Sequence, residues 1–327
     1  MMLMPLATLS AWAQGNDYNM VIELKNGTTV TLGANDVENL TFNGGSLSVS
    51  GNTIEDIYAQ IEELRDMIGK LQENAEPSVR TFNINGVPFK MVKVKGGTFQ
   101  MGSDSEAYPD QGPVHRVTLS DYYICQTEVT QKLWYAIMGE KPIPTWAGTQ
   151  WSSTLGVGDN IPAYFISWED CQSFISRVNE LTGLSFRMPT EAEWEYAARG
   201  GDKSEGYYFA GSNSVDDVAW YYFTTDCGIP WEYAVNYGIH EAGTKEPNEL
   251  GIYDMSGNVW EWCSDWYGPY SSSAQTNPTG PANGTERVIR GGCNSSMEDE
   301  CYSTYRYRYE PQTRSAIGLR LVLSTSL

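Results

Sequence analysis

Alternating apolar and polar positions mark the first part of the chain. They occur at 21–24 and 28–32, on either side of an Asn-Gly pair at 26–27 that is typical of a tight hairpin turn. A second turn signal, Asn-Gly-Gly, stands at 43–45 before another short polar-apolar stretch. We therefore predict a small β-unit over residues 16–52.

The pattern then changes to a helical period. Isoleucine and leucine recur at intervals of three and four residues, which is the seam of a heptad repeat, at positions Ile54, Ile57, Ile61, Leu64, Ile68 and Leu71. Two interpretations stay open for residues 53–75. They form an amphipathic helix that packs on its own domain, or residues 53–73 form a short coiled coil that joins copies of the chain into a homo-oligomer. Residues 74–77 are predicted to be a linker.

Residues 82–327 have a mixed pattern. Strand-like stretches at 89–94 and 117–119 alternate with helical stretches at 168–182 and 190–199. In the second of these helices, Thr190 and a glutamate three residues later form a capping box.

Long segments rich in glycine and asparagine, at 200–250 and 268–286, complete this domain. Loops of this length in a compact domain usually build a functional site. The fold class is therefore α+β, with little regular secondary structure.

The N-terminal residues predict where the protein is located, and the overall charge limits the kinds of partner it can bind. Residues 1–13 are mostly apolar and end in Ala-Trp-Ala, an A-x-A cleavage pattern, so residues 1–15 are predicted to be a signal peptide. We expect an exported protein: periplasmic, on the cell surface or secreted. No later segment approaches the roughly 20 apolar residues of a membrane span. The net charge of −20 argues against a nucleic-acid partner.

Histidine and cysteine limit the metal chemistry. The two histidines, His115 and His240, are too few for a three-histidine iron or zinc site within the chain. His115 is expected to be a structural residue at a strand edge. None of the six cysteines forms a C-x-x-C pair, so a zinc ribbon is not expected. Cys293 and Cys301 can bind copper(I), form a disulfide or be inert buried thiols, and an exported protein favours the disulfide.

Two carboxylates, Asp254 and Glu261, lie seven residues apart around a Gly-Asn turn. Calcium binds six to eight oxygen ligands, and these side chains and the turn's carbonyl groups can supply some of them. Alternatively Asp254 and Asn258 only cap turns and Glu261 is solvated.

Aromatic and cationic residues are abundant near the C-terminus. Trp260, Trp262 and Trp266 are expected to pack in the core or frame a groove. Four arginines alternate with tyrosines and are expected to form internal ion pairs and stacking contacts, or to line an anion-binding cleft, at Arg306, Arg308, Arg314 and Arg320.

Several motifs together resemble the formylglycine-generating (sulfatase-modifying factor) family. They occur in the family's order over about residues 84–325, at 89–102, 127–130, 187–200, 248–262, 287–292 and 317–321. The resemblance implies one compact domain related to C-type lectin folds. It also implies calcium bound by the side chains of Asp254 and Glu261 and the carbonyl groups of Gly257 and Val259. A second calcium site of the family would fall near 218–220, where its ligands are not recognisable.

The same resemblance raises the question of catalysis. Active members use copper(I), held by two cysteines, and O2 to oxidise a cysteine of a sulfatase to formylglycine. The family spacing places these ligands at Ser296 and Cys301, while Cys293 stands where a serine is usual. A hydroxyl group is a hard, weak ligand for copper(I).

Two hypotheses follow. The first is a non-catalytic, calcium-stabilised binding module for a protein or glycan ligand. The alternative is a copper-dependent oxidase acting on a cysteine-containing sulfatase peptide, with Cys301 as the essential thiol and Cys293 and Ser296 beside it.

Overall fold

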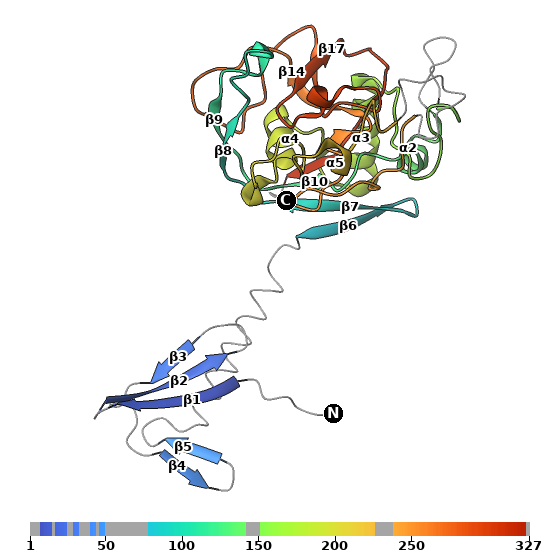
Figure 1. Cartoon of the computed structure of the whole chain (residues 1–327). Helices are drawn as coiled ribbons and strands as arrows, with labels where there is room; N and C mark the ends of the chain where they lie inside the picture. The colour runs from blue at the N-terminus through green and yellow to red at the C-terminus, as the bar shows by residue number, and fades with distance from the viewer. Residues whose placement is uncertain are drawn as a thin grey trace. The chain divides into compact units, whose positions relative to one another are not determined.

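The computed structural model describes residues 78–141, 151–225 and 238–324, and the course of five strands among the first 50 residues. Contacts divide the chain into two units, Met1–Glu76 and Pro77–Leu327 (Figure 1).

The first unit contains the strands predicted from the alternating pattern. Strands β1, β2 and β3 form one antiparallel sheet, and β4 and β5 form a separate hairpin. Their bounds are Ala7–Gln14, Asp17–Leu24, Thr29–Leu32, Leu40–Asn43 and Ser46–Val49. Strand β1 overlaps the residues assigned to a signal peptide, and that assignment stays a prediction. The helix at 53–75 and its heptad seam lie outside the described residues.

The second unit mixes helices and strands, as predicted. Its described helices are α2 (Gln131–Met138), α3 (Trp168–Thr182), α4 (Glu191–Ala198) and α5 (Val215–Val218), with 3-10 turns at η2 (Pro109–Gln111), η3 (Gly201–Lys203) and η4 (Glu298–Cys301). Its described strands run from β6 to β19: Val79–Ile84, Val87–Val94, Thr98–Met101, His115–Thr118, Tyr122–Cys125, Phe186–Arg187, Ala219–Trp220, Ser256–Gly257, Trp260–Trp266, Gln275–Thr276, Arg287–Arg290, Arg306–Tyr309, Ile317–Gly318 and Val322–Ser324.

A five-stranded sheet, in the order β11-β19-β10-β7-β6, supports one part of the core. Strand β6 pairs with β7 from Val79 onward, so regular structure begins a few residues before the predicted start at 82. Helices α2 and α3 pack together beside this sheet, and the rings of Trp134 and Phe174 stack 5.0 Å apart between them. Both Trp134 and Phe174 are buried.

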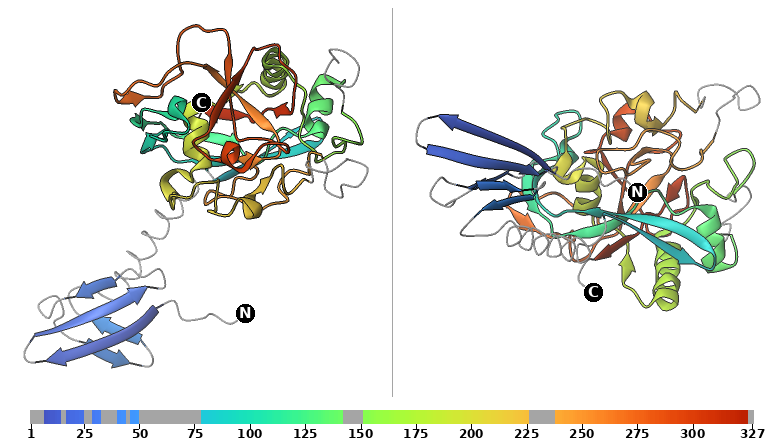
Figure 2. Two further views of the ribbon diagram at one scale, coloured as in Figure 1. Left: turned by 45° about the horizontal axis from the view of Figure 1, so that its top comes forward. Right: turned by 90° about the horizontal axis from the view of Figure 1, so that it is seen from below.

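A four-stranded sheet, in the order β17-β16-β14-β18, carries most of the candidate chemistry. Its strand β14 includes Trp260, which is 7% exposed, and Trp262, which is fully buried. Strand β17 alternates, with Arg306 and Arg308 on one face and Tyr307 and Tyr309 on the other. Strands β8, β9 and β15 form a third sheet, on the side of the unit opposite α2 (Figures 1 and 2).

Local sequence explains where the helices begin and end. Thr190 accepts a hydrogen bond from the Glu193 amide while the Glu193 carboxylate accepts one from the Thr190 amide, so the predicted capping box is confirmed. Ser167 and Asp170 cap α3 in the same way, and Gly183 ends it in the left-handed conformation.

The predicted irregular segments are also found. Between α4 and β13 the described residues contain only the short elements η3, α5 and β12. Within the described part of the chain, no helix combines the length and the apolar surface that crossing a bilayer requires.

Candidate functional site

The thiol loop, residues 291–301, follows β16 and ends with the 3-10 turn η4. Gly291 and Gly292 have φ values of +97° and +78°, a conformation that residues with a side chain rarely adopt. A Cβ atom on Gly292 would lie 2.9 Å from Sγ of Cys301. Glycine at this position therefore allows the chain to pass directly over the Cys301 thiol.

Cys293 and Ser296 form a tight turn in this loop. The Cys293 amide donates to Oγ of Ser296 at 3.1 Å, and the Ser296 amide donates to the carbonyl oxygen of Cys293 at 2.9 Å. Oγ of Ser296 also lies 3.7 Å from Sγ of Cys293. The Ser296 hydroxyl is therefore held by the loop's own backbone.

Cys293 and Cys301 are both free and buried, so the disulfide favoured from the sequence is wrong for this structure. Burial raises the pKa of the Cys301 thiol well above its usual value, and the neighbouring Cys293 adds to the effect. Cys301 is accordingly held as a neutral thiol. Of the other cysteines, those at 125, 171 and 263 are also free and buried.

Aromatic side chains lie beside the thiol loop. The ring of Trp260 is 6.0 Å from that of Tyr305 and 6.3 Å from that of Tyr307. Tyr307 and Met297 are among the exposed large apolar side chains. Trp260, Tyr305 and Tyr307 therefore form an aromatic cluster in which Tyr307 is exposed, while both thiols of the loop are buried.

Glu261 lies in the interior, where it is paired with Arg320. Nη2 of Arg320 donates to Oε1 of Glu261 at 2.6 Å, and Nε of Arg320 is 3.0 Å from both carboxylate oxygens. Nε1 of Trp194 donates to Oε2 of Glu261 at 2.7 Å. Both Glu261 and Arg320 are fully buried. This carboxylate has thus filled its acceptor positions with protein donors.

A second pair of buried carboxyl groups, Glu128 and Asp254, forms no ion pair of its own within the described residues, although the nearby Arg320 charge partly opposes the rise that burial causes in the pKa of both. Oε1 of Glu128 accepts from Nδ2 of Asn258 at 3.1 Å, whereas its Oε2 has no hydrogen-bond partner in the described parts of the chain. Burial raises the pKa of Asp254 to about 6, and burial together with the Asp254 charge raises that of Glu128. Arg320 is already paired with Glu261. An additional cation would favour the ionised form of both groups.

These contacts test the expected calcium ligands. Asp254 has a left-handed φ of +57°, and its carboxylate accepts a hydrogen bond from the Gly243 amide. Because other carboxylates surround it, Asp254 fits the role of a calcium ligand. Glu261 fits poorly, because a calcium ion would have to displace Arg320 or Trp194. Glu128, which the sequence analysis did not single out, fits better. No group of three or more His, Cys, Asp or Glu side chains has metal-binding geometry within 78–141, 151–225 and 238–324.

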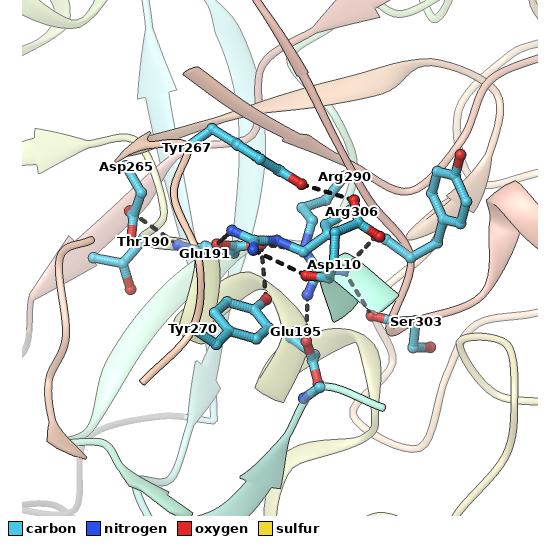
Figure 3. Close-up of polar contacts among 12 residues, drawn as sticks. Asp110, Thr190, Glu191, Glu195, Asp265, Tyr267, Tyr270, Arg290, Ser303 and Arg306 are labelled. Atoms are coloured by element: carbon cyan, nitrogen blue, oxygen red, sulfur yellow. Dashed lines mark hydrogen bonds and ion pairs between the residues drawn. The ribbon is translucent and has the colours of Figure 1, made fainter. Parts of the chain in front are cut away.

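Another buried network joins α4 to β16 and β17 (Figure 3). Glu191 accepts from Nε and Nη2 of Arg306 at 2.8 and 2.7 Å and from the Tyr270 hydroxyl at 2.9 Å. Arg290 pairs with Glu195 and lies 3.4 Å from Glu191. The prediction of internal ion pairs is therefore confirmed for Arg306, Arg314 and Arg320, whereas Arg308 pairs with Glu286 at the surface. Arg306 stacks on Tyr270 and Tyr267 and not on the tyrosines of its own segment.

Asp265 belongs to β14, and its side chain faces the N-terminal end of α4. Its Oδ2 accepts from the Glu191 amide and from the Ser264 hydroxyl, both at 3.0 Å (Figure 3 shows the first contact). Burial and the nearby Glu191 charge raise the pKa of Asp265 to about 7.

This pKa predicts a pH-dependent stability. The unfolded chain loses the Asp265 proton near pH 4, whereas the folded protein keeps it to about pH 7, so this group destabilises the fold progressively between these values. Asp265→Asn should therefore increase the free energy of unfolding more at pH 8 than at pH 5. Urea denaturation at both pH values measures this, and an equal effect at both would contradict it.

Comparison with known proteins agrees with this architecture. A family model, the sulfatase-modifying factor enzyme 1-like domain, matches residues 79–325. The chain belongs to the sulfatase-modifying factor family.

Relatives of this sulfatase-modifying factor protein have different names. It is 35% identical over 232 residues to the "Chaperone protein LppX" of Paenibacillus barcinonensis, covering 62% of this chain and 77% of the relative. It is 31% identical over 273 residues to the "Formylglycine-generating enzyme" of Streptomyces coelicolor, covering 69% and 83%. Among solved structures, "Treponema denticola variable protein 1" matches with a TM-score of 0.65 and 28% identity, covering 76% of this chain and all of that one.

The fold brings together some predicted site residues of the family and separates others. Cys293, Ser296 and Cys301 share one loop, as expected. Asp254 and Glu261 have different hydrogen-bond partners, since Glu261 is bonded to Arg320 and Asp254 to the amide of Gly243, although their charges affect each other. Gly257 is required by packing, since a Cβ atom there would lie 2.4 Å from the carbonyl oxygen of Trp220.

Proposed function

We propose that this protein is a non-catalytic binding module of the sulfatase-modifying factor family. The observation that supports the proposal is Ser296. It occupies the position of one expected copper ligand, and its hydroxyl group closes the turn with Cys293. Copper(I) prefers soft thiolates, and a backbone-bound hydroxyl offers neither softness nor charge.

Cys301 alone does not meet the needs of a copper(I) site. Two-coordinate binding requires two sulfur ligands, and only one of the two family positions carries sulfur. The residues at the two family positions therefore do not fit the metal, and we derive no oxidation step through it.

The copper-dependent oxidase remains the second candidate. It is favoured by the named formylglycine-generating relatives and by the two free thiols, with Cys293 replacing Ser296 as a ligand. Its substrate would be a cysteine-containing sulfatase peptide.

A copper(I) titration separates these candidates. The reduced protein is titrated against a chromophoric copper(I) chelator, alongside Ser296→Cys and a control, Ser204→Cys, which adds an exposed thiol outside the thiol loop. We expect the wild-type protein and Ser204→Cys to compete weakly, and Ser296→Cys to bind one equivalent at least a hundredfold more tightly, because it supplies the second thiolate. Tight binding by the wild-type protein that Cys301→Ala abolishes would overturn the proposal.

We infer further that calcium stabilises the domain. Asp254 supplies the carboxylate, Gly257 and Val259 the carbonyl groups, and Glu128 the second carboxylate, while Glu261 stays with Arg320. The orphaned oxygen of Glu128 and the raised pKa of Asp254 support this assignment. Calcium binds hard oxygen ligands of this kind.

The ligand of the binding module is a protein or a glycan that contacts the aromatic cluster beside the thiol loop. The exposed side chains of Tyr307 and Met297 support this placement. We also propose a relationship to C-type lectin folds, export by the signal peptide at 1–15, no nucleic-acid partner, and a homo-oligomer through residues 53–73. Light scattering tests the last of these, because a monomer would refute it.

A further inference from the structure

A pocket of about 500 Å³ lies on the arginine face of β17. Its walls come from β9, the beginning of α4, the end of β14 and the segment from 268 to 281, which includes β15. Arg306 lines it, whereas Tyr307, the next residue, faces Trp260 beside the thiol loop. The strand therefore separates this pocket from the surface that carries the proposed function. Pockets of this size hold small molecules.

Two acceptor atoms in this pocket have no protein donor. Asp265 is 3% exposed, and its Oδ2 is held by two donors. In the ionised form, which predominates above its pKa of about 7, Oδ1 is an acceptor to which no described residue donates. Nδ1 of His115 lies 3.0 Å from the carbonyl oxygen of Pro113, which can only accept, so Nδ1 carries the proton. Nε2 of neutral His115 is then an acceptor, and no described donor pairs with it. A ligand that supplies donors to both can replace the water that would otherwise satisfy them.

The charges around the pocket argue against an ionic ligand. Glu191 and Asp265 disfavour an anion. Arg306 lines the wall of the pocket. The Arg287 guanidinium lies 3.4 Å from the centre of the ring of Trp266, which also lines the pocket. The two arginine charges disfavour a cation. The site is thus suited to a neutral molecule.

The remaining lining matches a hydroxylated molecule. Side chains that both donate and accept hydrogen bonds come from Ser271, Gln275, Thr276 and Thr279. Carbon-rich surface comes from Trp266 and from three prolines at 269, 278 and 281. We propose that this pocket binds one neutral, hydroxyl-rich small molecule, a monosaccharide or a polyol of similar size, with Asp265 and His115 accepting hydrogen bonds from its hydroxyl groups.

Calorimetry and saturation-transfer NMR on the full chain test this assignment. The probes are methyl α-glucopyranoside, methyl α-mannopyranoside, methyl β-galactopyranoside and myo-inositol, with n-butylammonium chloride and sodium phosphate as ionic comparisons. We expect at least one hydroxylated probe to bind and neither ion to bind. Simple glycosides and the cyclitol also distinguish a sugar ring from a general polyol as the source of the hydroxyl groups.

Asp265→Asn is the decisive variant. Its amide oxygen can keep the Glu191 contact, but its NH2 group then faces the ligand as a donor, so affinity should fall about tenfold or more. Gln275→Ala, a change at a half-buried side chain, should weaken binding severalfold. Asp202→Asn, at an ion pair outside the pocket, should have no effect. The proposal is overturned if no hydroxylated probe binds, if Asp265→Asn binds as tightly as the wild-type protein, or if n-butylammonium binds through Asp265. The copper titration does not depend on any of these outcomes.

Discussion

Replacing Arg320 by methionine is expected to lower the free energy of unfolding by about 3–5 kcal/mol. Arg320 is fully buried and holds Glu261 through contacts of 2.6 and 3.0 Å. It also donates to the carbonyl oxygens of Cys125 and Tyr253 at 3.0 and 2.9 Å. Methionine fills a similar volume but leaves the Glu261 carboxylate in the interior without a cation. Urea denaturation measures the loss.

Two matched variants show whether the charge is the cause. Arg308 pairs with Glu286 at 3.0 Å, but the two side chains are 41% and 40% exposed, so Arg308→Met should cost at most about 1 kcal/mol. Adding Glu261→Gln to Arg320→Met removes the uncompensated charge and should recover part of the stability. If Arg320→Met and Arg308→Met had equal effects, the buried pair would not have the role assigned to it.

Removing calcium should lower the melting temperature strongly. Calcium at a thousand times its dissociation constant would stabilise the fold by about 4 kcal/mol. For a domain of this size, that corresponds to roughly 8–16 °C. The measurement is a thermal melt with excess calcium and with EGTA. Asp254→Asn should make the two melts coincide, whereas Asp159→Asn, at an exposed ion pair with Lys132, should leave the difference intact.

The same effect should depend on pH in a defined direction. Without calcium, Asp254 keeps its proton to about pH 6, so the calcium-free fold loses stability as the pH rises from about 4 to 6. Calcium competes with that proton. The difference between the two melts should therefore be largest at pH 7 and above and should shrink below pH 6. An effect of EGTA that is constant from pH 5 to pH 8 would be inconsistent with Asp254 as a ligand.

Local patterns predicted local structure well. The helix predicted at 168–182 has those bounds in the structure, because the apolar period and the serine cap both lie within the segment. Cys293, Ser296 and Cys301 share the thiol loop because they are close in sequence.

Contacts between distant residues were not predictable in this way. Glu128 meets Asn258 across 130 positions, and Arg306 meets Glu191 across 115. The family resemblance implied that Glu261 is a calcium ligand, and neither the resemblance nor the spacing shows that Arg320 neutralises it. The raised pKa of Asp265 depends on burial and on the nearby Glu191 charge, and neither can be inferred from local sequence patterns.

Strand β17 has a consequence for how this protein tolerates change. Its arginines complete one buried network and line a pocket, while its tyrosines stand beside the thiol loop. Substitutions can alter one set and spare the other. A deletion or insertion of a single residue would exchange the two faces at once, placing guanidinium groups against Trp260 and phenols against Glu191. Lineages of this domain should therefore vary in the composition of β17 but keep its length fixed.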